Sequence, residues 1–270
     1  YRVATGDGRL ERVTTLKGME RFALSPDGTR LALLHSGAYV PTQLAVAEAA
    51  GGAPPRELTD TRTAEYKALQ WPALDIVQVP SSHTRQPIYA KLYKPKDFDP
   101  ARKYPAVLFV HGAGYLQNVL LGYSPYFREQ MFNDMLTEHG YVVLDMDYRA
   151  SEGYGRDWRT AIYRDMGHPE LEDLIDGVHW LEKNKSVDPN RVGLYGGSYG
   201  GFMTLVAMFR APDVFKAGAA LRPVTDWTQY NHEYTSNILN DPQVDPIAYA
   251  RSSPIEFADG LKGALLICHG

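Results

Sequence analysis

The sequence contains a single cysteine, Cys268, among its 270 residues, so no disulfide can form within the chain. The redox compartment is therefore undecided. No apolar run approaches the roughly 20 residues that a transmembrane helix needs, and we expect no membrane span. No signal peptide opens the chain, which begins at Tyr1 rather than at a methionine. We interpret this start as a position within a longer protein, so the cellular location is undetermined.

An excess of positive charge is also lacking. The chain has 28 Lys and Arg against 32 Asp and Glu, a formal net charge of −4, so we expect no nucleic-acid partner. We expect neither a metal nor another cofactor, because no metal-ligand spacing links His35, His83, His139, His168 and His179. The 44% of hydrophobic residues suffices for a large core, in one large domain with a smaller piece or in two domains.

The first 60 residues contain a weak internal repeat. Tyr1–Thr14 and Leu44–Thr59 each combine an alternating apolar strand, a glycine-containing turn and a short strand. Between them, Phe22–Leu34 holds the turn Ser25–Gly28, flanked by strands on both sides. Four short strands at a period of roughly 40 residues are typical of a β-propeller blade. We therefore predict that residues 1–60 are the last strands of a propeller; a small meander is the alternative. Residues 61–73 are predicted to be a connector.

The remainder, residues 74–270, is predicted to be an α/β domain. A hairpin is expected first, from Leu74–Pro80 and Pro87–Tyr93. Buried strands and helices then alternate, which implies a parallel sheet with helices on both faces and ligands at the carboxyl ends of its strands. The predicted strands are Ala106–Val110, Tyr141–Met146, Arg191–Tyr195, Ala217–Leu221 and Ala264–Cys268. The predicted helices are Pro125–His139, which we expect to be amphipathic, Leu171–Asn184 and Tyr199–Phe209.

The chemistry is indicated by Gly196–Gly200, which fits the pattern G-x-S-x-G between a predicted strand and a predicted helix. This is the context of a nucleophile elbow, and we predict that Ser198 is the nucleophile. The flanking glycines would leave room for neighbouring strand and helix at a strained turn. The backbone N–H of Tyr199 can donate to a developing oxyanion. The alternative is a glycine-rich turn without chemistry.

A serine nucleophile needs a base and an orienting carboxylate, which follow it in the order Ser, Asp or Glu, His on this kind of fold. After Ser198 come only His232 and His269, and neither is placed as a base. We therefore expect the chain to lack the acid and the base of its triad. A second oxyanion donor is expected from the loop after strand Ala106–Val110, at the N–H of Gly112 or Ala113. The alternative is that this loop is only a tight turn.

Taken together, these motifs resemble the prolyl oligopeptidase family of serine peptidases, in particular its dipeptidyl-peptidase and acylaminoacyl-peptidase branches. The resemblance implies an α/β-hydrolase over residues 74–270, preceded by propeller blades, and a triad Asp and His beyond the end of the chain. His111 stands where the dipeptidyl-peptidase branch usually has Tyr. The matching stretches are Tyr93–Pro95, Lys103–Pro105, His111–Gly112, Asp147–Gly155, Asp188–Val192, Gly196–Gly201 and Leu265–Gly270.

The resemblance also implies a substrate pocket that would accept a proline ring, since aromatic surfaces stack well on such a ring. Its predicted lining is Val224, Trp227, Tyr230 and Tyr234, with Tyr199. The alternative is that these aromatic residues, which recur at helical spacing, only pack the core.

Other polar residues are interpreted as structural. Asp145 and Asp147 precede Ser198, and an ion pair with Arg149 is expected for them. A charge cluster at a helix start is expected for Glu170, Glu172 and Asp173, and a buried strand position for Cys268.

The sequence therefore predicts a serine peptidase that hydrolyses short peptides through an acyl-enzyme on Ser198, with Pro or Ala preferred at the cleaved position. The expected partners are short peptide substrates and, in a homo-oligomer, further copies of the chain. The chain alone is expected to be nearly inactive. The alternatives are a carboxylesterase on the same fold and a non-catalytic binding module.

Overall fold

A computed structural model describes residues 1–269, so Gly270, the last residue of the predicted α/β domain, lies outside the described residues. The chain divides into two compact units. The first comprises Tyr1–Ala73 and Leu120–Phe127, and the second comprises Leu74–Val119 and the remainder from Arg128 onward. Within residues 1–269, no helix combines the length and the apolar character that crossing a membrane requires.

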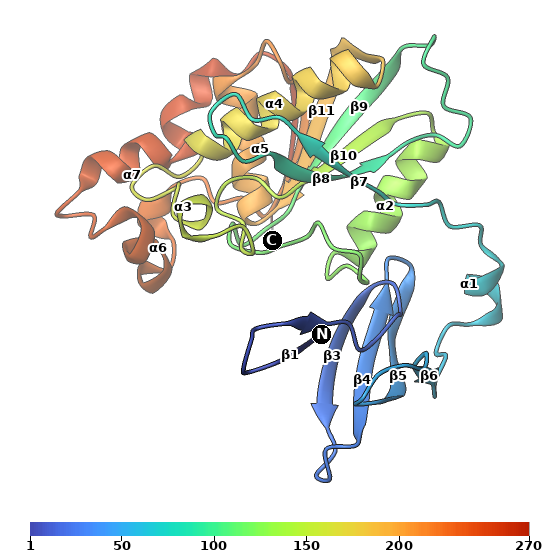
Figure 1. Cartoon of the computed structure of the whole chain (residues 1–270). Helices are drawn as coiled ribbons and strands as arrows, with labels where there is room; N and C mark the ends of the chain where they lie inside the picture. Colours follow the sequence, from blue (N-terminus) through green and yellow to red (C-terminus); the bar gives the residue numbers. More distant parts are fainter. Residues whose placement is uncertain (270) are drawn as a thin grey trace. The chain divides into compact units, whose positions relative to one another are not determined.

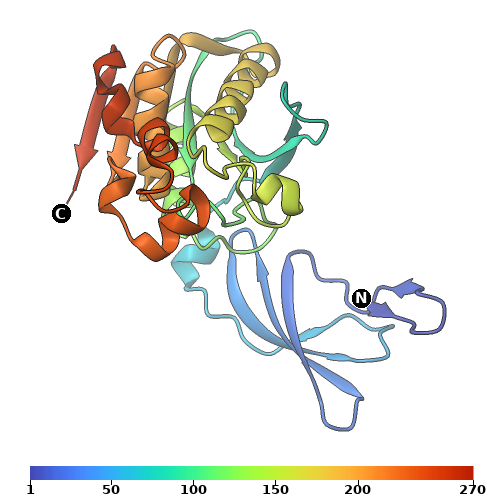
Figure 2. The same ribbon diagram turned by 90° about the vertical axis from the view of Figure 1, so that its left-hand side faces the viewer.

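The first unit is antiparallel. Strands β1 (Arg2–Val3) and β2 (Leu10–Glu11) form a small hairpin. The four-stranded sheet has the sequential order β3 (Met19–Leu24), β4 (Arg30–Gly37), β5 (Val40–Glu48) and β6 (Arg56–Glu57) (Figure 2). The predicted Ser25–Gly28 turn is confirmed: Gly28 has φ +72° and its N–H donates to the Ser25 carbonyl at 2.9 Å. Membership of this meander in a propeller stays a prediction. Helix α1 (Ala64–Ala68) lies in the predicted connector.

The second unit is built on a seven-stranded sheet with the order β13-β12-β11-β9-β10-β8-β7 (Figure 1). Strands β7 and β8 form the predicted antiparallel hairpin, β8 also pairs antiparallel with β10, and the remaining pairs are parallel. The strands are β7 (Asp75–Val79), β8 (Ile88–Tyr93), β9 (Tyr104–Val110), β10 (Val142–Met146), β11 (Val187–Gly197), β12 (Ala217–Leu221) and β13 (Ala264–Cys268).

Helices cover both faces of this sheet. On β11, Leu194 belongs to the main core cluster together with buried residues of α4 and α5, while Tyr195 contacts Phe132 and Asn133 of α2. Successive strand residues point to opposite faces, so α2 lies on the face opposite α4 and α5. The helical segments are α2 (Phe127–Glu138), α3 (Arg156–Arg159), α4 (His168–Asn184), α5 (Tyr199–Arg210), η1 (Trp227–Gln229), α6 (His232–Leu239), α7 (Pro246–Ser252) and η2 (Pro254–Gly260).

The predicted strands and helices of the second unit are confirmed to within a few residues at their ends. Two details are wrong. Helix α2 is not amphipathic in the expected sense, because it buries Gln130 and Asn133 while Phe132 and Met135 are exposed. Cys268 is exposed rather than buried, because β13 is the edge strand of the described sheet (Figure 2).

Candidate active site

Strand β11 delivers Ser198 to a sharp turn before α5. Ser198 has φ +58° and ψ −116°, a conformation that a residue with a side chain adopts only under strain. The turn is held by the Ser198 N–H, which donates to the Leu221 carbonyl at 2.9 Å, and by the Phe202 N–H, which donates to the Ser198 carbonyl at 2.9 Å. The predicted strained elbow is therefore present.

The glycines of the elbow are required by a close approach of the end of β9 to the turn between β11 and α5. A Cβ at Gly196 would lie 2.4 Å from the Val110 carbonyl oxygen, and a Cβ at Gly200 would lie 2.0 Å from the same oxygen. Both distances are far below van der Waals contact with a backbone atom that cannot move independently. The end of β9 and the elbow can approach one another only because these two side chains are missing.

A pocket of about 450 Å³ opens beside Ser198. It contains every residue that the sequence predicted for substrate binding, Val224, Trp227, Tyr230 and Tyr234, together with Tyr199. Of the two candidate oxyanion donors on the β9 loop, Ala113 lines the pocket and Gly112 is not part of its lining. The arrangement thus places a serine hydroxyl, a helix N-terminus and an aromatic wall around one cavity.

The loop after β9 is shaped against the Tyr199 ring. Ala113 and Gly114 have φ +58° and +55°, and a Cβ at Gly114 would lie 3.1 Å from that ring. His111 anchors the loop: its ring is fully buried, stacks on Tyr148 at 4.4 Å, and its Nε2 lies 3.0 Å from the Ser151 hydroxyl. Burial lowers the pKa of His111, so the neutral imidazole is favoured, and the residue holds the loop through its packing and hydrogen bonds.

The aromatic wall comes from η1 and α6. Trp227 is only 1% exposed, whereas Tyr230 is 45% exposed. The Trp227 ring contacts those of Tyr230 at 5.5 Å, Tyr199 at 5.8 Å and Tyr234 at 6.1 Å. Trp227 and Tyr199 also belong to the main core cluster. The same rings therefore pack the core and line the pocket, so the two interpretations of this segment are compatible.

Four further residues line the pocket and escaped the sequence reasoning: Tyr115, Asn231, Glu233 and Asn237. Glu233 and Asn237 could have been found, because positions 233, 234 and 237 share one face of α6. Asn231 is the N-cap of α6 and accepts from the Tyr234 N–H at 3.0 Å, which fixes that face toward the pocket. Tyr115 carries no local signal, since it arrives from the β9 loop.

Glu170 lies behind the pocket rather than in an exposed charge cluster. Its side chain is fully buried, accepts a hydrogen bond from the Tyr199 hydroxyl, and accepts the Gly167 N–H at 2.8 Å. Burial raises the pKa of Glu170 to about 8, against the opposing effect of the Tyr199 hydrogen bond. The three acidic residues do lie at the start of α4, as expected, but Glu170 and Asp173 are buried and take part in internal hydrogen bonds.

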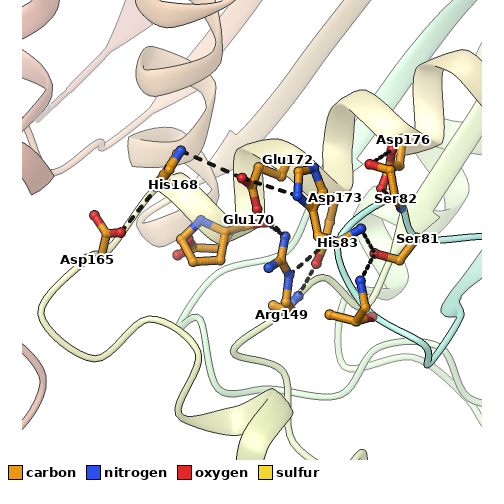
Figure 3. Close-up of polar contacts among 12 residues, drawn as sticks. Ser81, Ser82, His83, Arg149, Asp165, His168, Glu170, Glu172, Asp173 and Asp176 are labelled. Atoms are coloured by element: carbon orange, nitrogen blue, oxygen red, sulfur yellow. Dashed lines mark hydrogen bonds and ion pairs between the residues drawn. The ribbon is translucent and has the colours of Figure 1, made fainter.

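The ion pair expected for Arg149 is also wrong. Arg149 pairs with Asp173 at 2.9 Å and with Glu172 at 2.7 Å, both on α4 (Figure 3). Asp145 instead lies 3.9 Å from the Lys91 ammonium, and Asp147 accepts the N–H groups of Asn118 and Val119. These two carboxylates thus bind groups on neighbouring strands and loops, and the absence of a triad role for them stays a prediction.

Within residues 1–269, no histidine hydrogen-bonds the Ser198 hydroxyl. His232 lies on α6, largely exposed, with its Nε2 3.9 Å from an Asp241 carboxylate oxygen. In the same residues no group of three or more His, Cys, Asp and Glu side chains is arranged to hold a metal ion. The described site therefore consists of the Ser198 hydroxyl on a strained turn, the N-terminus of α5 and a pocket.

A mostly parallel sheet with a strained G-x-S-x-G serine between β11 and α5 defines an α/β-hydrolase. The sequence model of the prolyl oligopeptidase family matches residues 126–270, and the chain belongs to this family.

Individual relatives agree with this assignment. The chain is 34% identical over 189 residues to dipeptidyl peptidase 8 of Homo sapiens, an alignment that covers 68% of this chain and 21% of that protein. Dipeptidyl peptidase 4 of Porphyromonas gingivalis is similar in structure, with a TM-score of 0.85 and 30% identity over 97% of this chain and 37% of that one. An acylaminoacyl peptidase of Pyrococcus horikoshii shares the fold, with a TM-score of 0.78 at 24% identity, over 97% of this chain and 41% of that one. The chain thus spans about a fifth of the length of its curated relatives.

Proposed function

We propose that this chain carries the nucleophile and the substrate pocket of a serine peptidase that acts on short peptides. Ser198 attacks the carbonyl of the scissile bond and forms an acyl-enzyme, which water then hydrolyses. The Tyr199 N–H and the Ala113 part of the β9 loop stabilise the oxyanion. The observation that carries this proposal is the strained Ser198 at the mouth of an aromatic pocket.

The pocket supports a preference for Pro or Ala at the cleaved position. Val224, Trp227 and Tyr234 offer apolar surface next to Ser198, and a proline ring packs well on such rings. The names of two similar proteins, both dipeptidyl peptidases, support action on peptides, and the preference for Pro or Ala rests on the pocket alone.

Turnover requires a general base, and within residues 1–269 no histidine hydrogen-bonds the Ser198 hydroxyl. We therefore propose that these residues alone are nearly inactive, with a rate lower than that of a complete triad by a factor on the order of 10⁶. The strained elbow would still position the Ser198 hydroxyl, but no base would remove its proton.

Fluorophosphonate labelling, with the adduct mapped by mass spectrometry, tests this proposal. We expect little labelling of Ser198 in this chain and strong labelling of Ser198 in the full-length protein. The variant Ser198→Ala should abolish the labelling in both. Turnover of an X-Pro anilide should exceed that of p-nitrophenyl acetate in the full-length protein. The reverse order would favour an esterase, and absence of labelling there would contradict the proposal.

A further inference from the structure

The pocket beside Ser198 contains one formally charged side chain, Glu233. It lies in the first turn of α6, on the face that also carries Tyr234 and Asn237 into the pocket lining, and Tyr230 lies just before the helix. Five aromatic side chains share that lining: Tyr115, Tyr199, Trp227, Tyr230 and Tyr234. Glu233 is exposed, so its carboxylate stands at the solvent-facing rim of the aromatic pocket. The binding of a proline ring does not require such a carboxylate.

The Glu233 carboxylate is available for an incoming ligand. Within residues 1–269 it forms no ion pair with a lysine, arginine or histidine. The nearby cation, Arg159, instead lies over the Tyr115 ring, 5.4 Å from its centroid, and is not part of the lining. The Tyr115 ring thus already holds a cation on its face, and the carboxylate at the rim of the pocket has no ion-pair partner in residues 1–269.

The size of the pocket also exceeds the need of a single small ring. At about 450 Å³ it falls in the range of roughly 300 to 1,000 Å³ typical of sites for whole small ligands. It can therefore take an apolar group near Ser198 and a second group that reaches toward α6.

We propose that the pocket selects substrates with a cationic group, an ammonium or guanidinium, which Glu233 binds at the rim of the aromatic pocket. Aromatic faces attract cations through their quadrupole, and the carboxylate adds a direct charge interaction. The proposal rests on the proposed peptidase function, and it names the substrate class: peptides whose positive charge reaches the pocket. That charge comes either from a Lys or Arg side chain or from a free α-ammonium.

A purely structural role of Glu233 makes a different prediction. An acidic residue in the first turn of a helix stabilises the helix through its dipole, whatever ligand is present. Replacing Glu233 would then lower the stability of α6 without changing which ligands are preferred. The discriminating quantity is therefore the ratio of affinities for charged and neutral ligands, not the affinity itself.

This ratio can be measured without any turnover. Calorimetry or NMR is used to determine the affinity of the intact chain for three small amides. N-acetyl-lysine N-methylamide carries a side-chain cation, norleucine N-methylamide carries only an α-ammonium, and N-acetyl-norleucine N-methylamide is neutral. At least one cationic compound should bind about 3- to 10-fold more tightly than the neutral one. The cation that gains affinity identifies its source, and the gain should shrink as salt is added.

Two matched variants locate the effect. Glu233→Gln should remove the preference, whereas Glu138→Gln, at an exposed position on α2, should keep it. Circular dichroism confirms that both variants are folded. Three outcomes would overturn the proposal. They are equal affinity of the wild type for all three amides, no saturable binding of either cationic amide, and a preference that persists in Glu233→Gln. Since no bond is cleaved, this result is independent of Ser198 labelling, which tests the peptidase function.

Discussion

At the scale of single residues, the elbow glycines differ in what surrounds them. A Cβ at Gly200 would lie 2.0 Å from the backbone oxygen of Val110, whereas a Cβ at Gly197 would lie 3.0 Å from the end of the flexible Arg222 side chain. We expect Gly200→Ala to lower the free energy of unfolding by about 1–3 kcal/mol or more, because the backbone must shift. Gly197→Ala should cost little, since the guanidinium can move. Urea denaturation compares them, and equal effects would contradict this account.

Glu170 makes a second prediction at this scale, about pH. Its pKa is 4.5 in a model peptide and about 8 in the folded protein, so the folded state binds the proton more tightly. Its contribution to stability is complete below pH 4.5 and is lost as the pH rises toward 8. Glu170→Gln, which cannot ionise, should remove this decline and gain stability relative to the wild type as the pH rises.

Thermal or urea unfolding between pH 5 and pH 9 measures this difference, which can grow by up to about 1.4 kcal/mol per pH unit. Glu182→Gln, at a partly exposed position of the same helix, is the control and should parallel the wild type. Asp173, whose pKa burial raises to about 6, also contributes to the wild-type slope. The comparison between variants isolates Glu170, and parallel curves for Glu170→Gln and the wild type would show that its carboxyl is not held protonated.

At the scale of elements, α4 is fixed to the segment after β10 by the pair of Arg149 with Asp173. Both side chains are buried, and the Arg149 N–H also donates to Asp173 at 2.7 Å. Arg149→Met should lower the free energy of unfolding by about 3–5 kcal/mol, because it leaves a buried carboxylate without its partner. Urea denaturation measures this loss.

The double variant Arg149→Met with Asp173→Asn tests the cause. It should be more stable than Arg149→Met alone, because the unpaired charge is gone. The exposed pair of Arg156 and Asp157 is the comparison, and Arg156→Met should change stability little. If the double variant is as unstable as the single one, the loss arises from packing rather than from the buried charge.

The elements themselves could be predicted from the sequence, whereas their contacts could not. Runs such as Ala106–Val110 and Ala217–Leu221 are apolar and bounded by turn residues, and the pattern G-x-S-x-G at Gly196–Gly200 marks the elbow. The partner of Arg149 depends on how α4 approaches the sheet, which no local pattern encodes. Tyr115 and Glu233 enter the pocket from a loop and from a helix whose orientations are set by tertiary packing.

At the scale of the whole molecule, the two units differ in their cores. In the second unit, one continuous cluster of buried side chains runs through strands β8 to β11 and helices α4 and α5. In the first unit, the buried cluster consists of Leu33, Ala45 and Ala47, while Phe22 and Leu24 are exposed. A sheet with so little buried apolar area has little free energy with which to resist local opening.

This difference predicts how each unit exchanges its backbone hydrogens. The amides of β3–β6 should exchange with solvent deuterium much faster than those of β9–β11, because opening a poorly packed meander costs less than opening the central strands. Hydrogen–deuterium exchange with mass spectrometry resolves the two sets of peptides in one experiment. Peptides from β9 and β11 should exchange most slowly of the peptides compared. If β3–β6 were protected as strongly as β9–β11 at low protein concentration, the prediction would be contradicted. Protection of β3–β6 that rises with protein concentration would indicate that a second copy of the chain covers the exposed apolar side chains of this sheet.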